Sequence, residues 1–569
     1  MHSEVLVHRD ISLIRTVRRS GHLQFLIVAR FRRHRPHQSK GRSMFHHTRS
    51  RRLTLAVLFA TTLMLVTACG GGGDVASGGA PTAEGEPVPG GSAQIIQLAE
   101  PQSLDPAALS NTWAHMATLG NALYGTLITN DQATLETQYK MATDFVTTDG
   151  GKTFDLTLRP GLTFTDGTPL DAAAVKFNWD RLKDRSLGSN ATRYAILVEN
   201  TEVVSPNVMK ATLVDPNPQF AETLVASSMN WIASPTALQK GSQSYAEHPV
   251  GAGPFSLVNW TRQAEIELEK NPNYWDAPKP YLDRLTIRTV HDASQRLNAV
   301  ATGGADLASE SSMSTIEEAG AQGLHYEIVP TGGGQIVAMN HRRAPFDDVR
   351  ARRAVQMALD TEGLNTIVFA GKNEVPQTLF NKESPYYADI PLQDSNRQEA
   401  QRLFDELAAE GKPVAATFMA YPTSDSRMLA EAVQTQLSTY DNVEVKLDVR
   451  DIAGATKATM TGDFDLTISA AIVQGPDFAL WTAFHSTSAG NQMGVNDPEL
   501  DAALDKGRVA TTEAERIEAY TDVQNRIKAV VPGVWYTRAV PAVIYGKNVR
   551  GVQMYTLGSP LPEELWIVQ

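Results

Sequence analysis

Few residues of this chain have the types and spacings that catalysis or metal binding would need. The sequence contains no Gly-x-Ser-x-Gly nucleophile elbow and no His-Glu-x-x-His zinc motif. Gly151-Lys152-Thr153 ends like a phosphate loop, but Val146 stands where the first glycine is required. We therefore predict no catalytic residues, no metal and no cofactor, and leave open only a metal site assembled from distant positions. No two histidines beyond the tether have the i, i+4 spacing of a helical metal pair: His115, His248, His291, His325, His341 and His485.

Cys69, the only cysteine in the chain, is the residue best placed for covalent chemistry. It ends an apolar run of 16 residues, 53–68, which is preceded by arginines and followed by four glycines. This run is shorter than the roughly 18 apolar residues of a membrane-spanning helix, so residues 44–68 are predicted to be a signal peptide. The small residue before Cys69 resembles the lipobox of bacterial lipoproteins, whose cysteine is acylated and becomes the N-terminus. An ordinary secretory signal with an incidental cysteine is the alternative.

The two segments that flank this signal indicate how the mature protein begins. Residues 1–43 are rich in Arg and His, and we predict that they are a misassigned extension, with translation starting at Met44 and not at Met1. Residues 69–91 combine Cys69 with a Gly- and Pro-rich tether that has almost nothing to bury. We therefore expect a globular body held at the outer face of the cell membrane, or in the periplasm, by a lipid anchor.

The charge of the mature chain excludes nucleic acid as a partner. The whole chain carries a net charge of −12, but residues 1–52 hold 13 Lys and Arg against two acidic residues. The part that starts at Cys69 therefore carries −23. Phosphate neutralisation needs clustered cations, which such an acidic protein does not offer.

Strand and helix patterns alternate from Ser92 onward and predict an α/β protein of several lobes. Residues 93–99, 154–158 and 162–164 are predicted strands, and residues 111–127 a predicted helix. Asp171 is expected to cap a helix whose buried stripe is Val175, Trp179 and Leu182. Thr512 with Glu515 has the spacing of a capping box ahead of a long helix that reaches about Val530.

Four separated motifs carry a resemblance to a known family. They are the stretch 158–177 (LRPGLTFTDGTPLDAAAVKF), then 249–255 (PVGAGPF), 271–275 (NPNYW) and 345–350 (PFDDVR) leading to 358–360. Together, and in this order, they resemble the family 5 extracellular solute-binding proteins, the peptide- and nickel-type receptors of ABC importers. The glycines and prolines in these motifs set turns, and the apolar residues are expected to be core, so none of them is a predicted ligand contact.

The resemblance implies a two-lobed clamp of the periplasmic-binding-protein class II type, with an extra subdomain in the first lobe. The first lobe would span residues 92–334, with the extra subdomain near 129–250, and would take back residues 535–569. The second lobe would span 335–534, and strands crossing near 331–338 and 532–540 would form the hinge. Such a receptor closes on its ligand and presents it to a permease that is driven by a separate ATPase.

The same resemblance suggests which residues line the cleft. In peptide-binding members an aspartate pairs with the ammonium of the ligand, and the matching position here is Gln474, with Asp477 at a later acidic position. This departure argues against ligands with a free N-terminus, because a buried ammonium needs a carboxylate partner. If the alignment slips by three residues, Asp477 itself would be that partner. Arg427 lies near the position of an arginine that binds ligand carboxylates, although a solvated helix start explains it too. Further candidates for the cleft are Trp113, Tyr421, Trp481 and Asn491.

These observations favour a receptor over an enzyme. The expected ligand is an oligopeptide or a peptide-like solute, with a sugar or a metal chelate as the alternative, and the receptor is expected to act as a monomer. Two readings from other classes stay open. One is a hydrolase tethered to the envelope, against which the missing catalytic motifs count, and the other is a structural or signalling lipoprotein with a degenerate cleft.

Overall fold

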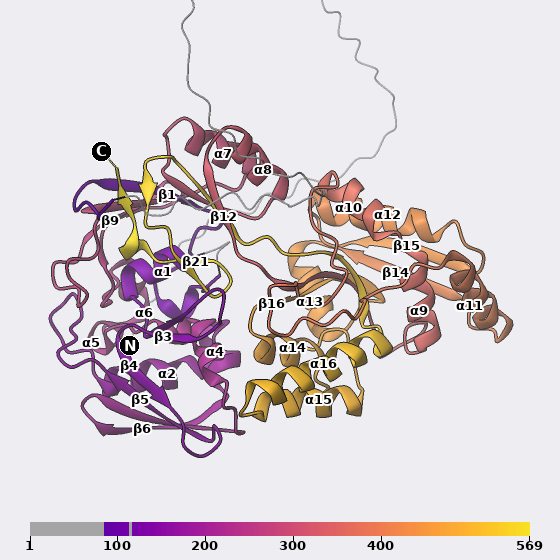
Figure 1. Ribbon diagram of the computed structural model, residues 1–569, viewed down its shortest axis with the longest axis horizontal. Helices are drawn as coiled ribbons and strands as arrows, with labels where there is room; N and C mark the ends of the chain where they lie inside the picture. Colours follow the sequence, from indigo (N-terminus) through magenta and orange to yellow (C-terminus); the bar gives the residue numbers. More distant parts are fainter. Residues whose placement is uncertain (1–84, 113–115, 569) are drawn as a thin grey trace, which may run out of the picture. The chain divides into compact units, whose positions relative to one another are not determined.

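The computed structural model describes residues 85–112 and 116–568. The predicted signal peptide, Cys69 and Trp113 lie outside these described residues. Two large sheets, each with helices on both faces, give the described chain an α/β fold (Figure 1). Neither a helix long and apolar enough to cross a membrane nor a cluster of three or more potential metal ligands occurs within the described ranges.

The first lobe is built on a seven-stranded sheet whose strands come from distant parts of the sequence. Side chains alternate across a strand, so neighbouring residues of its central strand enter different cores. Ile95 packs with Leu119 of α1 (Ala117–Tyr124), whereas Ile96 packs with Leu297 of α7 (Ala293–Ala301) and Ile316 of α8 (Met313–Ala321). The strand order is β12 (His325–Ile328), β18 (Ala542–Tyr545), β11 (Leu307–Glu310), β1 (Ser92–Gln97), β10 (Arg284–Thr289), β9 (Glu265–Lys270), β8 (Phe255–Thr261).

A separate four-stranded antiparallel sheet packs against helix α2 (Ala172–Leu182) within the same lobe. The Asp171 carboxylate accepts the amide of Ala174 at the start of α2, and Val175, Trp179 and Leu182 are buried, which confirms the predicted cap and stripe. The strand order is β4 (Ala142–Val146), β5 (Thr153–Leu158), β7 (Val208–Leu213), β6 (Val198–Ser205).

One predicted element next to these sheets is wrong, and another begins later than predicted. Residues 162–164 form no strand, because the tight turn between Phe164 and Thr168 leaves room for a single bridge, from Thr163 to Pro169. The helix predicted from residue 111 begins only at Ala117, in α1 (Ala117–Tyr124). Asn111 is held outside it, because its side-chain amide donates to the Val225 carbonyl and the Tyr555 hydroxyl.

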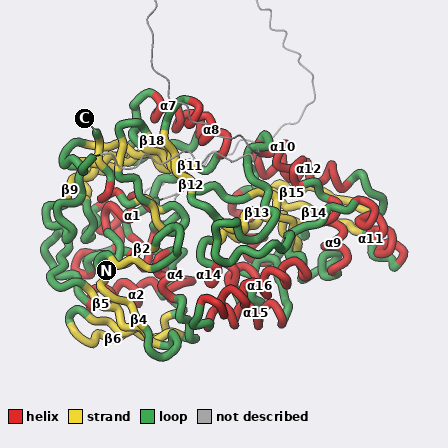
Figure 2. The backbone as a smooth tube through the Cα atoms, viewed as in Figure 1, coloured by secondary structure: helices red, strands yellow, loops and turns green. Residues whose placement is uncertain are grey.

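The second lobe is a five-stranded sheet between two helical layers. In its strand β13 (Gly332–Met339), Val337 and Met339 face the core of one helical layer, whereas Ile336 and Ala338 face the core of the other. Figure 2 shows α15 and α16 lying side by side below the sheet. The strand order is β15 (Val443–Val449), β14 (Val414–Ala420), β16 (Leu466–Val473), β13 (Gly332–Met339), β17 (Gly533–Thr537).

The helices complete both lobes, and the capping box predicted at Thr512 and Glu515 is present at the start of α16. In the first lobe the remaining helices are α3 (Thr192–Ala195), α4 (Phe220–Val225), α5 (Pro235–Leu238), α6 (Ser242–Glu247), α7 (Ala293–Ala301) and α8 (Met313–Ala321). In the second they are α9 (Val349–Ala358), α10 (Thr361–Phe369), α11 (Arg397–Ala409), α12 (Ser424–Leu437), α13 (Ile452–Thr461), α14 (Pro476–Phe484), α15 (Pro498–Val509) and α16 (Glu513–Val530).

Two short segments, one before β13 and one after β17, join the two large sheets. They run side by side, because the Val329 amide donates to the Pro541 carbonyl at 2.8 Å and the Thr331 hydroxyl to the Ala539 carbonyl at 3.0 Å. Gly334 has φ +142°, and a Cβ there would lie 2.1 Å from the Thr537 carbonyl oxygen. Only glycine therefore lets β13 and β17 approach so closely at this crossing.

Candidate ligand-binding cavity

A cavity of about 670 Å³ lies between the two lobes, and residues of both form its wall. This volume is within the roughly 300–1,000 Å³ typical of small-molecule sites. Part of the wall comes from two small hairpins, β2 (Ile128–Asn130) with β3 (Thr137–Tyr139), and β20 (Met554–Tyr555) with β21 (Ser559–Pro560). The first-lobe lining consists of Asn111, Thr112, Asn130, Leu135, Thr137, Arg193, Tyr194, Glu222, Val225, Ala226, Thr556 and Leu557.

The second lobe lines the cavity mainly with small side chains from β16, α14 and the loop after α14. Because these side chains are small, the second lobe presents few long polar groups to the cavity, and three glutamines are the exceptions. Most other polar side chains of the lining come from the first lobe. The second-lobe lining consists of Gln335, Ile468, Ser469, Ala470, Ala471, Ile472, Gln474, Gly475, Phe478, Ala479, Thr482, Ala483, Gly490, Gln492 and Met493.

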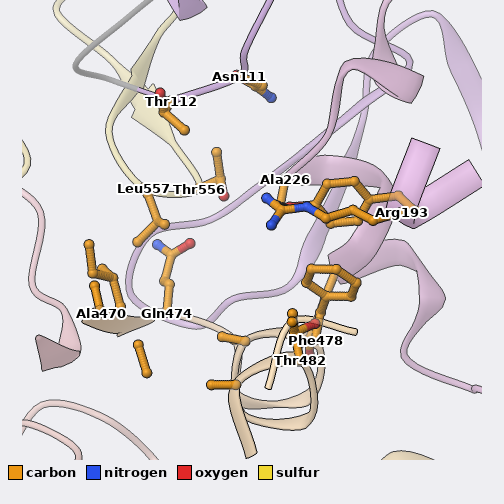
Figure 3. A pocket seen from close by; sticks show the side chains of 18 of the residues that line it. Asn111, Thr112, Arg193, Ala226, Ala470, Gln474, Phe478, Thr482, Thr556 and Leu557 are labelled. Atoms are coloured by element: carbon orange, nitrogen blue, oxygen red, sulfur yellow. Dashed lines mark hydrogen bonds between the residues drawn. The ribbon is translucent and has the colours of Figure 1, made fainter. Parts of the chain in front are cut away.

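Gln474 follows β16 directly and lies in the cavity wall (Figure 3). Its side-chain amide donates to the Oε1 atom of Gln132 at 2.6 Å, and its Oε1 atom accepts from Asn130 at 3.5 Å. Gln132 and Asn130 are in turn fixed to the backbone of Thr556 in the β20–β21 turn. Gln474 thereby joins the second lobe to the first through neutral amides.

Glu222 and Arg193 are the charged residues among the described cavity lining. The Glu222 carboxylate, from α4, pairs with the Arg516 guanidinium of the second lobe at 2.6 Å. Burial raises the pKa of the Glu222 carboxyl above its ordinary value; Arg516 lowers that pKa, and the Asp477 charge raises it again, so that the net direction is upward. Its second oxygen, Oε2, is covered by Gly475, where a Cβ would lie 2.3 Å away.

Arg193 lies on α3 with its guanidinium against two aromatic rings. The guanidinium carbon is 4.8 Å from the ring centroid of Tyr194 and 5.8 Å from that of Phe478, and one Nη donates to the Tyr194 hydroxyl at 3.0 Å. The two rings are themselves 4.2 Å apart and come from different lobes. No carboxylate of the described residues forms an ion pair with Arg193.

Asp477, a candidate for binding a ligand ammonium, does not line this cavity. It is 1% exposed, and both of its oxygens are engaged. Oδ1 accepts from the Arg508 guanidinium at 3.0 Å, and Oδ2 accepts from the side-chain amide of Asn217, in the first lobe, at 2.9 Å. This carboxylate therefore joins the lobes and leaves no oxygen for a ligand.

Trp481 and Asn491 also lie outside the lining, for different reasons. The Trp481 ring stacks on His485 at 4.6 Å, lies 4.2 Å from the Arg508 guanidinium and donates its indole N–H to Asp505 at 3.2 Å. It thus packs between α14 and α15. The Asn491 side chain is buried and exchanges hydrogen bonds with the backbone of Val495, so it shapes its own loop.

Arg427 and Tyr421 are likewise absent from the lining. Arg427 is exposed on the first turns of α12. Tyr421 packs against the small core around Met419 and Phe464, and its hydroxyl lies 3.3 Å from that of Thr459. Of the described candidates, only Gln474 is a lining residue of this cavity.

Sequence reasoning missed Arg193, Glu222 and the pair formed by Tyr194 and Phe478. Phe478 directly follows Asp477, a predicted site residue, so its aromatic character was a usable signal. Arg193 belongs to a helix of four residues, and Glu222 is one acidic residue among many. Only the tertiary fold brings these side chains to one cavity.

Comparison with known proteins agrees with this architecture. Residues 136–491 match the family model described as bacterial extracellular solute-binding proteins, family 5 Middle. The glutathione-binding protein GsiB of Salmonella paratyphi A is 34% identical over 237 residues, which are 41% of this chain and 45% of that protein. The chain thus matches about half the length of such curated relatives.

Two solved structures have a similar fold. AgaA of A. tumefaciens R10, solved in complex with agropinic acid, has a TM-score of 0.72 and 24% identity, covering 84% of this chain and 99% of that one. The ABC transporter-associated periplasmic binding protein DppA of Helicobacter pylori, solved with the peptide STSA, has a TM-score of 0.72 and 20% identity, covering 84% and 98%. These two likenesses concern the fold.

Proposed function

The chain belongs to family 5 of the bacterial extracellular solute-binding proteins, and from this premise we propose that it captures a peptide or peptide-like solute for an ABC importer. The solute would bind between the two lobes and be delivered to a permease driven by its own ATPase. One observation carries the proposal: both lobes wall the 670 Å³ cavity, and a solute inside it would touch both. Binding and closure would therefore be coupled.

The connection between the lobes supports a clamp. Two adjacent segments, before β13 and after β17, join the large sheets, and rotation about them would open the cavity without disturbing either core. We propose that the hinge lies where these segments meet β13 and β17, within the ranges 331–338 and 532–540 that the resemblance implies. The first lobe would then be 92–334 with 535–569, its extra subdomain about 129–250, and the second lobe 335–534.

The ligands for which similar proteins are named, or with which they were solved, suggest the kind of solute. They are glutathione, agropinic acid and a peptide, all compounds with amide or amino-acid groups. The neutral amides that line this cavity, including Gln474 and Asn130, suit hydrogen bonds to such groups. A sugar or a metal chelate is the alternative ligand class.

We further propose that the protein acts as a receptor and not as an enzyme, and that Cys69 carries the lipid that holds it outside the cytoplasm. Family membership supports the first point. The apolar run before Cys69 and the Gly-rich tether after it support the second.

A ligand screen tests the proposal. The purified protein would be heated with di- to octapeptides, oligosaccharides and metal chelates, each in large excess. A ligand at 100 times its Kd adds about 2.7 kcal/mol to the unfolding free energy, enough to raise the melting temperature measurably. A rise with peptides or amino-acid derivatives supports the proposal. A rise only with sugars or chelates would assign the alternative class, and chemical turnover of a ligand would overturn the receptor role.

A further inference from the structure

The cavity wall has an excess of positive charge at one place, and we propose that this place selects the ligand. We infer that Arg193, held on Tyr194 and Phe478, is a carboxylate-binding subsite, and that the solute is an anion with no free ammonium group. The inference rests on the proposed function, because it presumes that a solute occupies the cavity.

The guanidinium of Arg193 is held against two aromatic rings at the solvent-accessible cavity wall, and no carboxylate of the described residues pairs with it. Contacts with the faces of Tyr194 and Phe478 fix its plane, and one Nη donates to the Tyr194 hydroxyl. The remaining N–H donors have no acceptor among the described residues. Figure 3 shows the guanidinium directed across the cavity, toward Thr556 and Gln474. A planar fork held in this way matches a carboxylate, which it can bind through two parallel hydrogen bonds.

No carboxylate of the described lining balances this charge or remains for a ligand ammonium. Glu222 already pairs with Arg516, and its Oε2 atom is shut off by Gly475. Asp477 is buried outside the lining, between Arg508 and Asn217. A ligand ammonium would have to shed water here without gaining an ionic partner, which costs several kcal/mol.

Neutral groups of the second lobe add to the same preference. Gln335 and Gln492 use their Oε1 atoms as acceptors, for the Tyr536 and Ser469 hydroxyls respectively. Within the described chain their side-chain nitrogens have no acceptor, so they can donate to a ligand. With Arg193 they make the cavity richer in donors than in acceptors. This complements a carboxylate-bearing solute with a substituted nitrogen, such as an N-acyl or N-alkyl amino acid, or a peptide with a blocked N-terminus.

The test uses four forms of each member of a tripeptide panel, which differ only at their ends. They are the free peptide, the N-acetyl acid, the C-terminal amide and the N-acetyl amide, titrated calorimetrically into the purified full chain. We expect the N-acetyl acids to bind tightest and the C-terminal amides, which carry a net positive charge, to bind weakest. Because hydrogen bonds to charged groups contribute about 1.5–3 kcal/mol, Arg193→Gln should weaken binding of the N-acetyl acids about 10- to 100-fold.

Two further variants make the result specific. Arg193→Lys keeps the charge but not the fork, and should recover part of the affinity. Arg185→Gln is the matched control, because Arg185 is an exposed arginine of the same lobe outside the cavity lining, and it should bind like the parent protein. Thermal denaturation of Arg193→Gln without ligand verifies that it is folded.

The possible outcomes distinguish a failure of the carboxylate subsite from a failure of the proposed receptor function. Tighter binding of free-ammonium or amidated forms, or equal binding of N-acetyl acids by Arg193→Gln and the parent, would overturn the carboxylate subsite and leave the receptor role standing. Binding by no form of any tripeptide would overturn the peptide-like ligand class and this inference with it.

Discussion

Two of the contacts between the lobes beside the cavity are of opposite character. One, the amide contact, joins Gln474 to Gln132 and Asn130 through neutral groups, and Gln474 and Asn130 lie in the cavity wall. The other, the charged contact, joins Glu222 to Arg516, and Asp477 to Arg508 and Asn217. Neutral amides exchange partners with water or a ligand at small cost, whereas a buried charge that loses its partner is strongly unfavourable. The amide contact is therefore suited to give way to a ligand, and the charged contact to hold the lobes in register.

The largest effect is expected where the charged contact is most buried. Asp477→Ala removes the carboxylate from Arg508, which is 8% exposed, and from the Asn217 amide. Breaking one side of a buried ion pair costs about 3–5 kcal/mol, so the unfolding free energy should fall by this amount in urea denaturation. Asp522→Ala, on an exposed 3.9 Å pair with Lys506, is the control and should change it by less than about 1 kcal/mol. Equal effects of the two substitutions would remove the distinction between buried and exposed pairs.

A smaller effect is expected from Gly475→Ala. Gly475 has φ −79° and ψ 134°, which any residue adopts, so the cost comes only from the clash of the new Cβ with Glu222 Oε2. Overpacking of this kind costs about 1–3 kcal/mol. Because Glu222 and Gly475 lie on different lobes, rotation at the hinge relieves the clash, and we expect a larger radius of gyration in small-angle scattering.

A double variant distinguishes this clash from other causes. Adding Glu222→Ala to Gly475→Ala removes the obstructing atom, so the radius should return to the value of Glu222→Ala alone. A radius that stays large in the double variant would place the cause elsewhere than in the Gly475–Glu222 approach.

The charged contact explains why the sequence predicted the fold better than the site. The helix cap at Asp171 and the capping box at Thr512 depend on residues three positions away, and both are confirmed. Asp477 depends on Arg508, 31 positions on, and on Asn217, 260 positions before it. No local sequence pattern predicts that Arg508 and Asn217 bind the two oxygens of Asp477. The sequence therefore suggested a carboxylate available to a ligand, whereas in the structure it is already hydrogen-bonded.

The errors in the predicted elements have the same origin. Asn111 stands at the start of a helical pattern, yet its side chain bonds to Val225 and Tyr555, and the helix begins later. Arg193 and Glu222 gave no signal in the sequence, because tertiary contacts distinguish them. Arg193 has no carboxylate partner among the described residues, whereas Glu222 is paired with Arg516. Gln474, which does line the cavity, was a candidate because a family pattern, and not local propensity, pointed to its position.

The charged contact should also make stability depend on pH. The pKa of Glu222 is raised above its ordinary value of 4.5 in the folded protein, chiefly by burial, with Arg516 opposing and Asp477 adding to the rise. The folded state thus binds a proton more tightly than the unfolded state, and the unfolding free energy should fall as pH rises from 4.5 through the raised pKa. Urea denaturation across this window, compared between the parent and Glu222→Gln, measures the contribution. An equal pH dependence in both proteins would show that Glu222 contributes none of it.

The amide contact should give the smallest effect and no such pH dependence. Gln474→Ala removes a neutral hydrogen bond of 2.6 Å to Gln132, and the freed Gln132 lines a second, smaller pocket beside Gln474, where water can replace the lost partner. The unfolding free energy should fall by about 1 kcal/mol or less, equally on the acidic and the neutral side of the Glu222 titration. Gln132→Ala should give a similar loss, and the double variant should lose less than the sum of the two, because the same bond is removed in each. A loss approaching that of Asp477→Ala would mean that the amide contact, like the charged one, is a fixed joint that a ligand cannot replace.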